Sequence, residues 1–202
     1  KPDLISADNR WAITGLLEAV NGRLNVAISD ALGKGVTWGC GDLEEYLIAD
    51  RVTMDIDVGE GFSYEQARDL SRRIIDNFNR YLGVMPIITH TGCKGIHITL
   101  FLSEPLNVRL LGPAREGIFW LAGLDRLGLR LDGHTLYGKH AFRLPYTVNV
   151  RCGGLAKFVN ADPRELDRQA HMIETRVIMA LPQVVEAVRG SVGEVVAGRD
   201  GS

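Results

Sequence analysis

Residues 51–58 read Arg-Val-Thr-Met-Asp-Ile-Asp-Val, and residues 91–101 read Thr-Gly-Cys-Lys-Gly-Ile-His-Ile-Thr-Leu-Phe. In the first stretch apolar residues alternate with polar ones, which is the period of a strand with one buried face. The alternation places Asp55 and Asp57 on the polar face, about 7 Å apart along the chain. Two carboxylates held together repel each other unless a cation lies between them. Because hard oxygen ligands suit Mg²⁺ or Mn²⁺, the stretch predicts a strand that carries a divalent-metal site.

The second stretch supplies the opposite charge. Thr91 to Gly95 reads as a tight turn with two glycines, which permit positive φ and a close approach of the backbone to a ligand. Lys94 lies at the tip of the turn, and His97 follows on the polar side of another alternating strand. A lysine and a histidine beside exposed backbone N–H groups form a phosphate site. Metal-binding acids followed by a phosphate cradle indicate chemistry on a nucleoside triphosphate.

Length and composition are ordinary for a globular protein. The 202 residues carry a net charge of −2, which provides no global basic signature for coating DNA but allows a local basic groove. We expect a single catalytic domain at 1–190 and a flexible glycine-rich tail at 190–202. No signal peptide or membrane-spanning run is evident, so we expect a cytoplasmic protein, or one at the nucleoid in a prokaryote. Because the chain begins at Lys1 without Met, we expect a fragment of a longer protein.

The three cysteines, Cys40, Cys93 and Cys152, are scattered and odd in number. They form no Cys-x-x-Cys pair. Their pattern therefore indicates neither a disulfide framework nor a structural zinc site.

Periodicity and capping signals predict the remaining elements. Helices are expected at 1–22, from Ser63 to Gly83 with a Ser63–Gln66 capping box, at 114–127 after Pro113, and at 163–188 with a break at Pro182. Strands are expected at 24–29, 84–89, 96–101, 129–132, 142–144, 147–150 and 156–159, and a glycine-rich loop at 30–42. Because strands and helices interleave, we predict an α+β fold in which helices flank a mixed or antiparallel sheet around the acids.

Four motifs then occur in a fixed order within the core 51–160. They read Met54-Asp55-Ile56-Asp57, Thr91-Gly92-Cys93-Lys94-Gly95-Ile96-His97, Leu131-Asp132, and Arg143-Leu144-Pro145-Tyr146-Thr147-Val148-Asn149. In this order they resemble the archaeo-eukaryotic primase superfamily, which includes small primase subunits, primase-polymerases and the polymerase domain of end-joining ligases. The chain departs from the family pattern at Thr91, where serine is usual, at Val148, where leucine is usual, and at Asn149, where histidine or arginine is frequent. The zinc-binding residues of many cellular primase subunits are absent.

The resemblance implies a primase-polymerase catalytic fold and template-directed nucleotidyl transfer, by a DNA primase, a DNA polymerase or both. It implies two Mg²⁺ or Mn²⁺ ions, about 3.5–4 Å apart, and no zinc. The metal ligands and catalytic acids that it implies are Asp55, Asp57 and Asp132. The nucleotide-binding residues that it implies are Thr91, Lys94, His97, Arg143, Asn149 and Arg151. The expected partners are a single-stranded DNA template with its primer, ribo- or deoxynucleoside triphosphates, and a large primase subunit or a helicase.

Two other classes of function stay open. One is an accessory primase subunit that binds nucleic acid without catalysis, against which the intact acids argue. The other is a metal-dependent glycosyltransferase, because an Asp-x-Asp pair also holds Mn²⁺ with a sugar nucleotide. Asp132 has an ordinary alternative as well, since Asp-Gly is a common turn.

Overall fold

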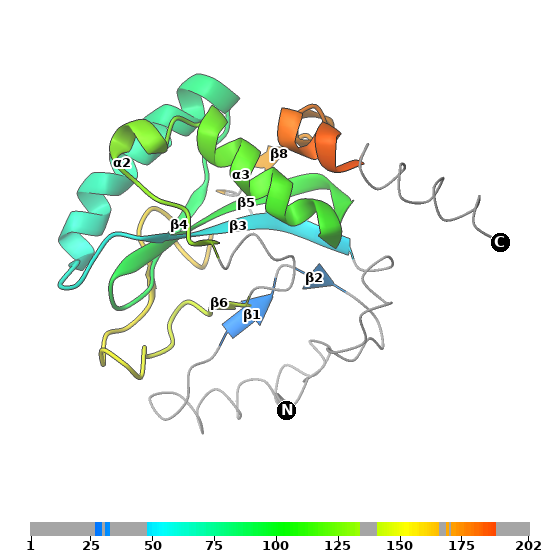
Figure 1. The fold of residues 1–202 in the computed structure, drawn as a ribbon. Coiled ribbons are helices and arrows are strands. Elements are labelled where there is room, and N and C mark those ends of the chain that lie inside the picture. Colours follow the sequence, from blue (N-terminus) through cyan, green and yellow to red (C-terminus); the bar gives the residue numbers. More distant parts are fainter. Residues whose placement is uncertain are drawn as a thin grey trace.

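The acidic stretch forms a strand, as predicted, which is β3 (Ile48–Asp57), an inner strand of the main sheet. The structure is a computed structural model that describes residues 27–29, 31–32, 48–133, 141–165, 169 and 171–188. β3 pairs antiparallel with β5 (Gly95–Asn107), a longer strand than the predicted 96–101. The predicted α+β fold is confirmed, because helices pack on one face of this largely antiparallel sheet (Figure 1).

Four more strands complete the main sheet, in the order β2-β3-β5-β4-β7 with β8 beside β5. They are β2 (Ala31–Leu32), β4 (Ile87–His90), β7 (Lys157–Phe158) and β8 (Met172–Ile173). β4 replaces the predicted strand 84–89, and β7 lies within the predicted 156–159. The predicted strand 147–150 is instead a turn that keeps one bridge, between Val148 and Leu155.

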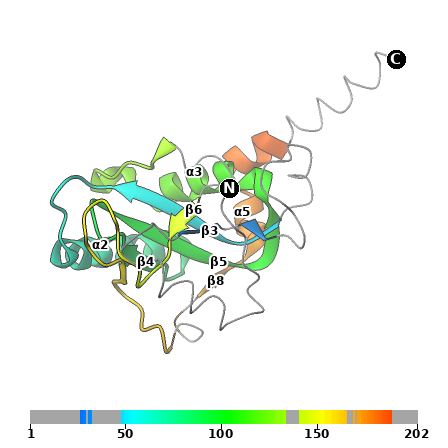
Figure 2. The same ribbon diagram turned by 90° about the horizontal axis from the view of Figure 1, so that it is seen from below.

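A second, two-stranded antiparallel sheet consists of β1 (Ala27–Ser29) and β6 (Ala141–Arg143). Figure 1 shows this ribbon below the main sheet, on the side opposite the helices, and Figure 2 shows the same arrangement from below. The polar face of β3 and β5 therefore faces this second, two-stranded layer.

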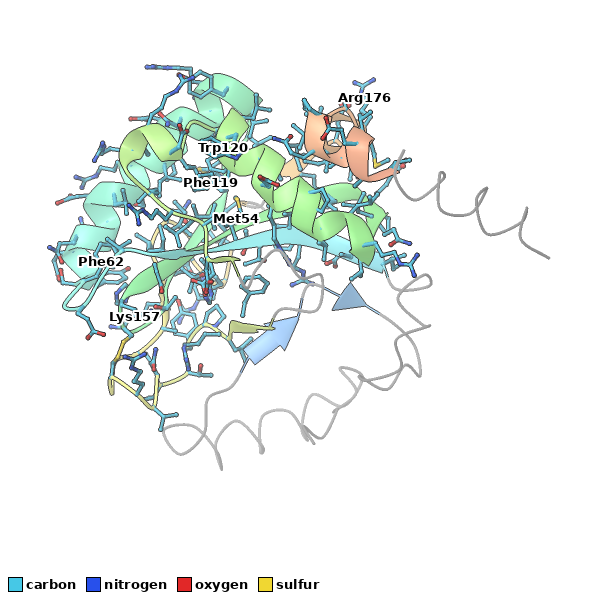
Figure 3. The ribbon with its side chains drawn as sticks, in the orientation of Figure 1. Met54, Phe62, Phe119, Trp120, Lys157 and Arg176 are labelled. Atoms are coloured by element: carbon cyan, nitrogen blue, oxygen red, sulfur yellow. A yellow bond between two sulfur atoms is a disulfide. The ribbon has the colours of Figure 1, made fainter. Side chains whose placement is uncertain are left out.

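The helix side of the sheet holds the apolar core. α2 (Tyr64–Leu82) begins after Ser63, whose side chain and that of Gln66 form the predicted capping box, and ends at Gly83 in the left-handed conformation. Met54 on β3 is fully buried and lies on the helix side of the strand (Figure 3). The same face carries other side chains with at most 1% of their surface exposed, which are Val52, Ile56, Ile96, Ile98 and Leu100. Burial of these side chains fixes which face of each strand remains polar.

α3 differs from its predicted bounds of 114–127. It spans Leu111–Leu121, after a 3₁₀ turn η2 (Val108–Leu110), and a separate 3₁₀ turn η3 (Asp125–Leu127) follows. Pro113 falls inside the first turn, where a missing N–H costs no helical hydrogen bond. Gly123 at φ 62° ends the helix early, and Leu121, in its last turn, is 42% exposed.

The predicted C-terminal helix is wrong at 172–174. Met172 and Ile173 form β8, which runs parallel to β5 and faces Phe101 and Leu102. Ile173 is only 2% exposed, so its burial against the sheet outweighs its helical spacing. Helix α5 (Thr175–Met179) follows, and residues 182–188 are helical after Pro182. The helix predicted at 1–22, most of the loop 30–42 and the tail lie outside the described residues, and the single-domain boundary at 190 stays a prediction.

Gly92 provides a test of backbone packing in the lysine turn. It has φ 74°, and an added Cβ would lie 2.8 Å from the carbonyl carbon of Gly154 and 2.9 Å from the nitrogen of Ala156. Gly61 has φ 76° but nothing within 4 Å of an added Cβ, so Gly61→Ala is a matched control. Both variants incur about 1–2 kcal/mol for the left-handed backbone. Gly92→Ala should lose about 1–3 kcal/mol more in the free energy of unfolding, measured by denaturant titration. Equal losses for the two variants would contradict the close contact.

Candidate functional site

The antiparallel register of β3 and β5 places predicted site residues of the two strands opposite each other. Asp55 lies opposite His97, and Asp57 lies opposite Gly95, the last residue of the lysine turn. The His97 Nε2 atom is 3.7 Å from Asp55 Oδ1, and the two side chains are 6% and 20% exposed. An acid and an imidazole that are distant in sequence therefore share one sheltered position on the polar face.

The third acid joins this position from another segment. Leu131 forms an antiparallel bridge with Ile56, and the backbone N–H of Asp132 donates to the carbonyl of Asp55 at 3.0 Å. Of the strand expected at 129–132, the structure keeps this one bridge beside β3. The short segment continues the sheet at the edge of β3 and places Asp132 next to Asp55.

Electrostatic repulsion among the acids is visible in Asp55. Burial, followed by the charges of Asp57 and Asp132, raises the pKa of its carboxyl from 3.8 to about 7, although Lys94 and Arg143 act in the opposite direction. The two cations do not balance the three acids and the loss of water. A cation bound among the carboxylates would relieve this repulsion.

Lys94 is already paired with one of the acids. Its Nζ donates to Asp57 Oδ2, and this hydrogen bond is the main reason why the pKa of the lysine is raised. The Lys94 carbonyl also accepts from the N–H groups of Val58 and Gly59, at 2.9 and 3.0 Å. The lysine turn is thereby attached to the end of β3, and its ammonium remains accessible on the surface.

Arg143 approaches from the second layer, at the end of β6. Its neighbour Phe142 is 3% exposed and packs edge-on against the His97 ring, with centroids 5.4 Å apart. Burial lowers the pKa of Arg143, and the nearby Asp55 carboxylate partly offsets this effect. The arginine therefore faces the acids from across the cleft.

Thr91 and Asn149 have partners inside the fold. The Thr91 hydroxyl donates to the carbonyl of Gly95 at 3.0 Å and closes the lysine turn. The Asn149 amide donates to the Thr91 carbonyl at 3.2 Å, and its oxygen accepts from the Arg151 N–H at 3.2 Å. Both residues are buried, at 8% and 6% exposure. In the structure these two residues join the lysine turn to the segment 149–154. Their contact with a nucleotide stays a prediction.

Arg151 lies on the surface beside the lysine turn. Its Nη2 atom is 3.4 Å from Glu60 Oε1, and its side chain is 69% exposed. The charge of Arg151 lowers the pKa of Lys94, whereas Asp57 raises it, so the two cations are close enough to repel each other. Lys94 and Arg151, which are both predicted to bind phosphate, thus lie near each other on the surface, each on a different turn.

A cavity of about 220 Å³ lies over the polar face, between β3–β5 and the β6 segment. The residues that line it are Arg51, Thr53, Ile87, Thr89, His97, Thr99, Phe101, Phe142, Arg143, Leu144, Pro145 and Phe158. At one end it includes His97 and Arg143. The cavity therefore extends from His97 and Arg143 along a floor that carries three threonine side chains.

No protein-family model and no curated protein sequence matches this chain. Two solved structures are similar to it. One is the AEP domain of the primase-polymerase of cyanophage S-2L, with 15% identity, a TM-score of 0.43, and coverage of 66% of this chain and 60% of that chain. The other is the polymerase domain of Ligase D from Mycobacterium tuberculosis in complex with DNA, with 18% identity, a TM-score of 0.46, and coverage of 77% and 58%. The chain thus spans less than two thirds of either solved chain.

Two features of the site were missed by the sequence analysis. Cys93 and Cys152 form a disulfide, with their Cα atoms 5.5 Å apart, although their spacing of 59 residues suggested no pairing. The expectation that the cysteine pattern indicates no disulfide is therefore wrong for this pair. Nothing local in the sequence marks it, because the pairing depends on how two distant turns meet.

Arg115 is the second missed residue. It is fully buried in α3, its Nε donates to the Thr53 carbonyl at 2.8 Å, and its guanidinium lies 5.2 Å from the centroid of the Phe142 ring. The available signal was a charged residue at helical spacing from Leu111 and Ile118, which are both core residues. Arg115 joins α3, β3 and the β6 segment that carries Arg143.

The residues fit a divalent metal by their chemistry. Three carboxylates from β3 and residue 132 influence one another, and hard cations prefer such oxygen ligands. Within the described ranges, however, no three His, Cys, Asp or Glu side chains converge into a group that could hold a metal ion as they stand. The Lys94 ammonium also donates to one oxygen of the Asp57 carboxylate.

The helices in the described part of the chain are each too short or too polar to cross a membrane.

The raised pKa of Asp55 predicts a pH-dependent stability. Its folded-state pKa of about 7 exceeds the ordinary value of 3.8, so a proton binds the folded state more tightly. The resulting stabilisation is complete below about pH 4 and is lost as the pH rises toward 7. Asp55→Asn removes this loss and should gain stability over the wild type between about pH 5 and 8, by about 4 kcal/mol at most.

Denaturant titrations without metal at several pH values would measure this difference. Asp76→Asn, an exposed position on α2, serves as the control. If wild type and Asp55→Asn follow the same pH profile, the raised pKa of Asp55 is contradicted.

Proposed function

We propose that this protein is a template-directed nucleotidyltransferase, a DNA primase or DNA polymerase that joins nucleotides by a metal-dependent reaction. The observation that supports this proposal most strongly is that the charges of Asp57 and Asp132 act on buried Asp55, together with those of Lys94 and Arg143. Acids grouped beside cations suit a substrate that brings both divalent metal and phosphate. A nucleoside triphosphate is such a substrate.

The three acids would hold Mg²⁺ or Mn²⁺. When bound, such ions lower the pKa of an attacking hydroxyl and offset the charge that develops on the reacting phosphate. The contribution of the chain is to keep the carboxylates together at a cost visible in the raised pKa of Asp55. A site that is strained by repulsion when empty gains stability when it binds a cation.

Lys94 would change partners on nucleotide binding. Without ligand its ammonium is held by Asp57, at a position where the Lys94 side chain is 36% exposed. A phosphate oxygen can replace the carboxylate as the acceptor, and Asp57 is then available to a metal ion. Nucleotide and metal binding would support each other through this exchange.

Arg143 and His97 would hold the triphosphate from the inner side of the cleft. Phe142 packs against the His97 ring and fixes its orientation beside Asp55. A guanidinium with a fixed fork of donors suits phosphate oxygens. The cavity of about 220 Å³ that begins at these residues offers room for the nucleoside beside its phosphates.

A primer-extension assay tests the proposal directly. The full chain would be incubated with a single-stranded template, with and without primer, with each nucleotide set, and with Mg²⁺ or Mn²⁺. We expect nucleotide incorporation that the double variant Asp55→Ala/Asp57→Ala abolishes and that Asp132→Asn largely removes, because both remove metal-binding charge. Asp125→Asn, an acid on η3 outside the group, should retain activity.

The outcomes separate the classes of function. Undiminished extension by the double variant at saturating Mn²⁺ would refute the proposal. Template binding without incorporation by the wild type would favour the accessory subunit. Transfer or hydrolysis of a nucleotide sugar without any DNA would favour the glycosyltransferase.

Charge removal in the cradle should affect nucleotide use more than template binding. Lys94→Ala, His97→Ala and Arg143→Ala should each weaken nucleotide use by about 1.5–3 kcal/mol, which is the value of a charge-assisted hydrogen bond. KM and kcat for the incoming nucleotide, together with template affinity, would be measured for each. Arg72→Ala is a control, because this arginine lies on α2 and its side chain is 68% exposed. If the variants lose DNA affinity but keep their nucleotide KM, these residues line a template groove.

A further inference from the structure

Two turns from distant parts of the chain pack tightly beside the acids. The lysine turn, 91–95, contacts a second turn, 149–154, which carries Arg151. The Asn149 amide donates to the Thr91 carbonyl, and the backbones meet so closely at Gly92 and Gly154 that neither has room for a side chain. The contact between the turns is therefore part of the fold.

Hydrogen bonds inside each turn support this contact. In the second turn, the N–H groups of Cys152 and Gly153 donate to the Asn149 carbonyl, at 3.2 and 2.7 Å. In the lysine turn, the Gly92 N–H donates to the His90 Nδ1 atom at 3.3 Å. None of these bonds involves sulfur, so the formation of each turn by itself does not require the disulfide.

The disulfide between Cys93 and Cys152 joins the two turns at their outer side. Its Cα separation of 5.5 Å is within the range that a disulfide spans without moving the backbone. Cys93 precedes Lys94, and Cys152 follows Arg151. One covalent bridge thus holds the neighbours of two cations that repel each other.

The partners of these cations also lie together. Lys94 pairs with Asp57, and Arg151 pairs with Glu60, on the short segment that follows β3. The Arg151–Glu60 pair is exposed, at 69% and 81%, and such pairs contribute little stability in water. The position of Arg151 therefore depends on its own turn more than on its ion pair.

We propose that the Cys93–Cys152 disulfide is a redox-dependent tether that positions Lys94 and Arg151 for a triphosphate. The two cysteines are positioning residues, since they act through the adjacent cations, and the inference rests on the proposed nucleotide-binding function. With the bridge closed, the cations are held together before the ligand arrives. With the bridge open, their repulsion and the freedom of the long side chains oppose the same arrangement.

The redox step is ordinary thiol–disulfide exchange. A thiolate of the pair attacks an external disulfide such as oxidised glutathione, forms a mixed disulfide and releases one glutathione thiol. The second thiolate attacks the protein sulfur of the mixed disulfide, closes the Cys93–Cys152 bond and releases the second thiol. Two electrons and two protons pass to the glutathione. Cys152 is exposed, so the reagent can reach the pair.

The test uses the full chain equilibrated with oxidised or reduced glutathione. Alkylation and mass spectrometry give the redox state of each cysteine, and calorimetric titration with inorganic tripolyphosphate gives the affinity of the cradle. We expect the oxidised protein to bind about three- to tenfold more tightly, the gain of immobilising one or two side chains in advance. In primer extension the same change should appear in the nucleotide KM and leave kcat unchanged.

Variants distinguish positioning from general stability. Cys93→Ser and Cys152→Ser should bind tripolyphosphate like the reduced wild type in both buffers, whereas Cys40→Ser should keep the redox response. Arg151→Ala keeps the bridge but should lose most of the response, because one of the two tethered cations is gone. Melting curves of each protein in both buffers show that the comparison is made between folded states.

The results bear separately on the two proposals. Failure of Cys93 and Cys152 to pair at any glutathione ratio, or equal affinities of the oxidised and reduced wild type, would overturn the tether and leave the proposed function standing. A full redox response in Arg151→Ala would also overturn it. Absence of both tripolyphosphate binding and nucleotide incorporation would refute the proposed function, and the tether with it.

Discussion

The antiparallel register of β3 against β5 is the constraint on which the site depends. It places Asp55 opposite His97 and Asp57 opposite the glycine that ends the lysine turn. A slip of one residue would turn both acids toward the helices, because side chains alternate between faces. The buried residues of β3, among them Met54 and Ile56, exclude this slip, since it would expose them to water. The apolar core thus determines the polar chemistry on the other face.

Charge balance in the ligand-free protein follows from this geometry. The acids and cations of the site come from segments that are distant in the sequence, and each cation already lies near an acid. Lys94 pairs with Asp57, Arg151 with Glu60, and Arg143 acts on Asp55. The net charge of the whole chain is only −2, although the site contains charges of both signs.

The sequence predicted the elements whose signals are local and missed those decided by distant contacts. Alternation was sufficient for β3, and Ser63 with Gln66 was sufficient for the start of α2, because these patterns arise within a few residues. Ile173 shows the opposite case, since its helical spacing gave way to pairing with β5. The Cys93–Cys152 bond and the internal partners of Asn149 depend on two turns that meet only in the folded chain. For the same reason the sequence predicted the acids of the site but not the buried Arg115.

That arginine connects the two sides of the sheet mechanically. Arg115 extends from α3, in the helical layer, to the Thr53 carbonyl on β3 and to the Phe142 ring in the second layer. A fully buried guanidinium cannot shift without losing contacts that no water is present to replace. A displacement of α3 would therefore be transmitted to Phe142 and the adjacent Arg143. A displacement imposed on the outer surface of α3, where Trp120 is 52% exposed, would thus reach the cavity on the opposite face of the sheet (Figure 3).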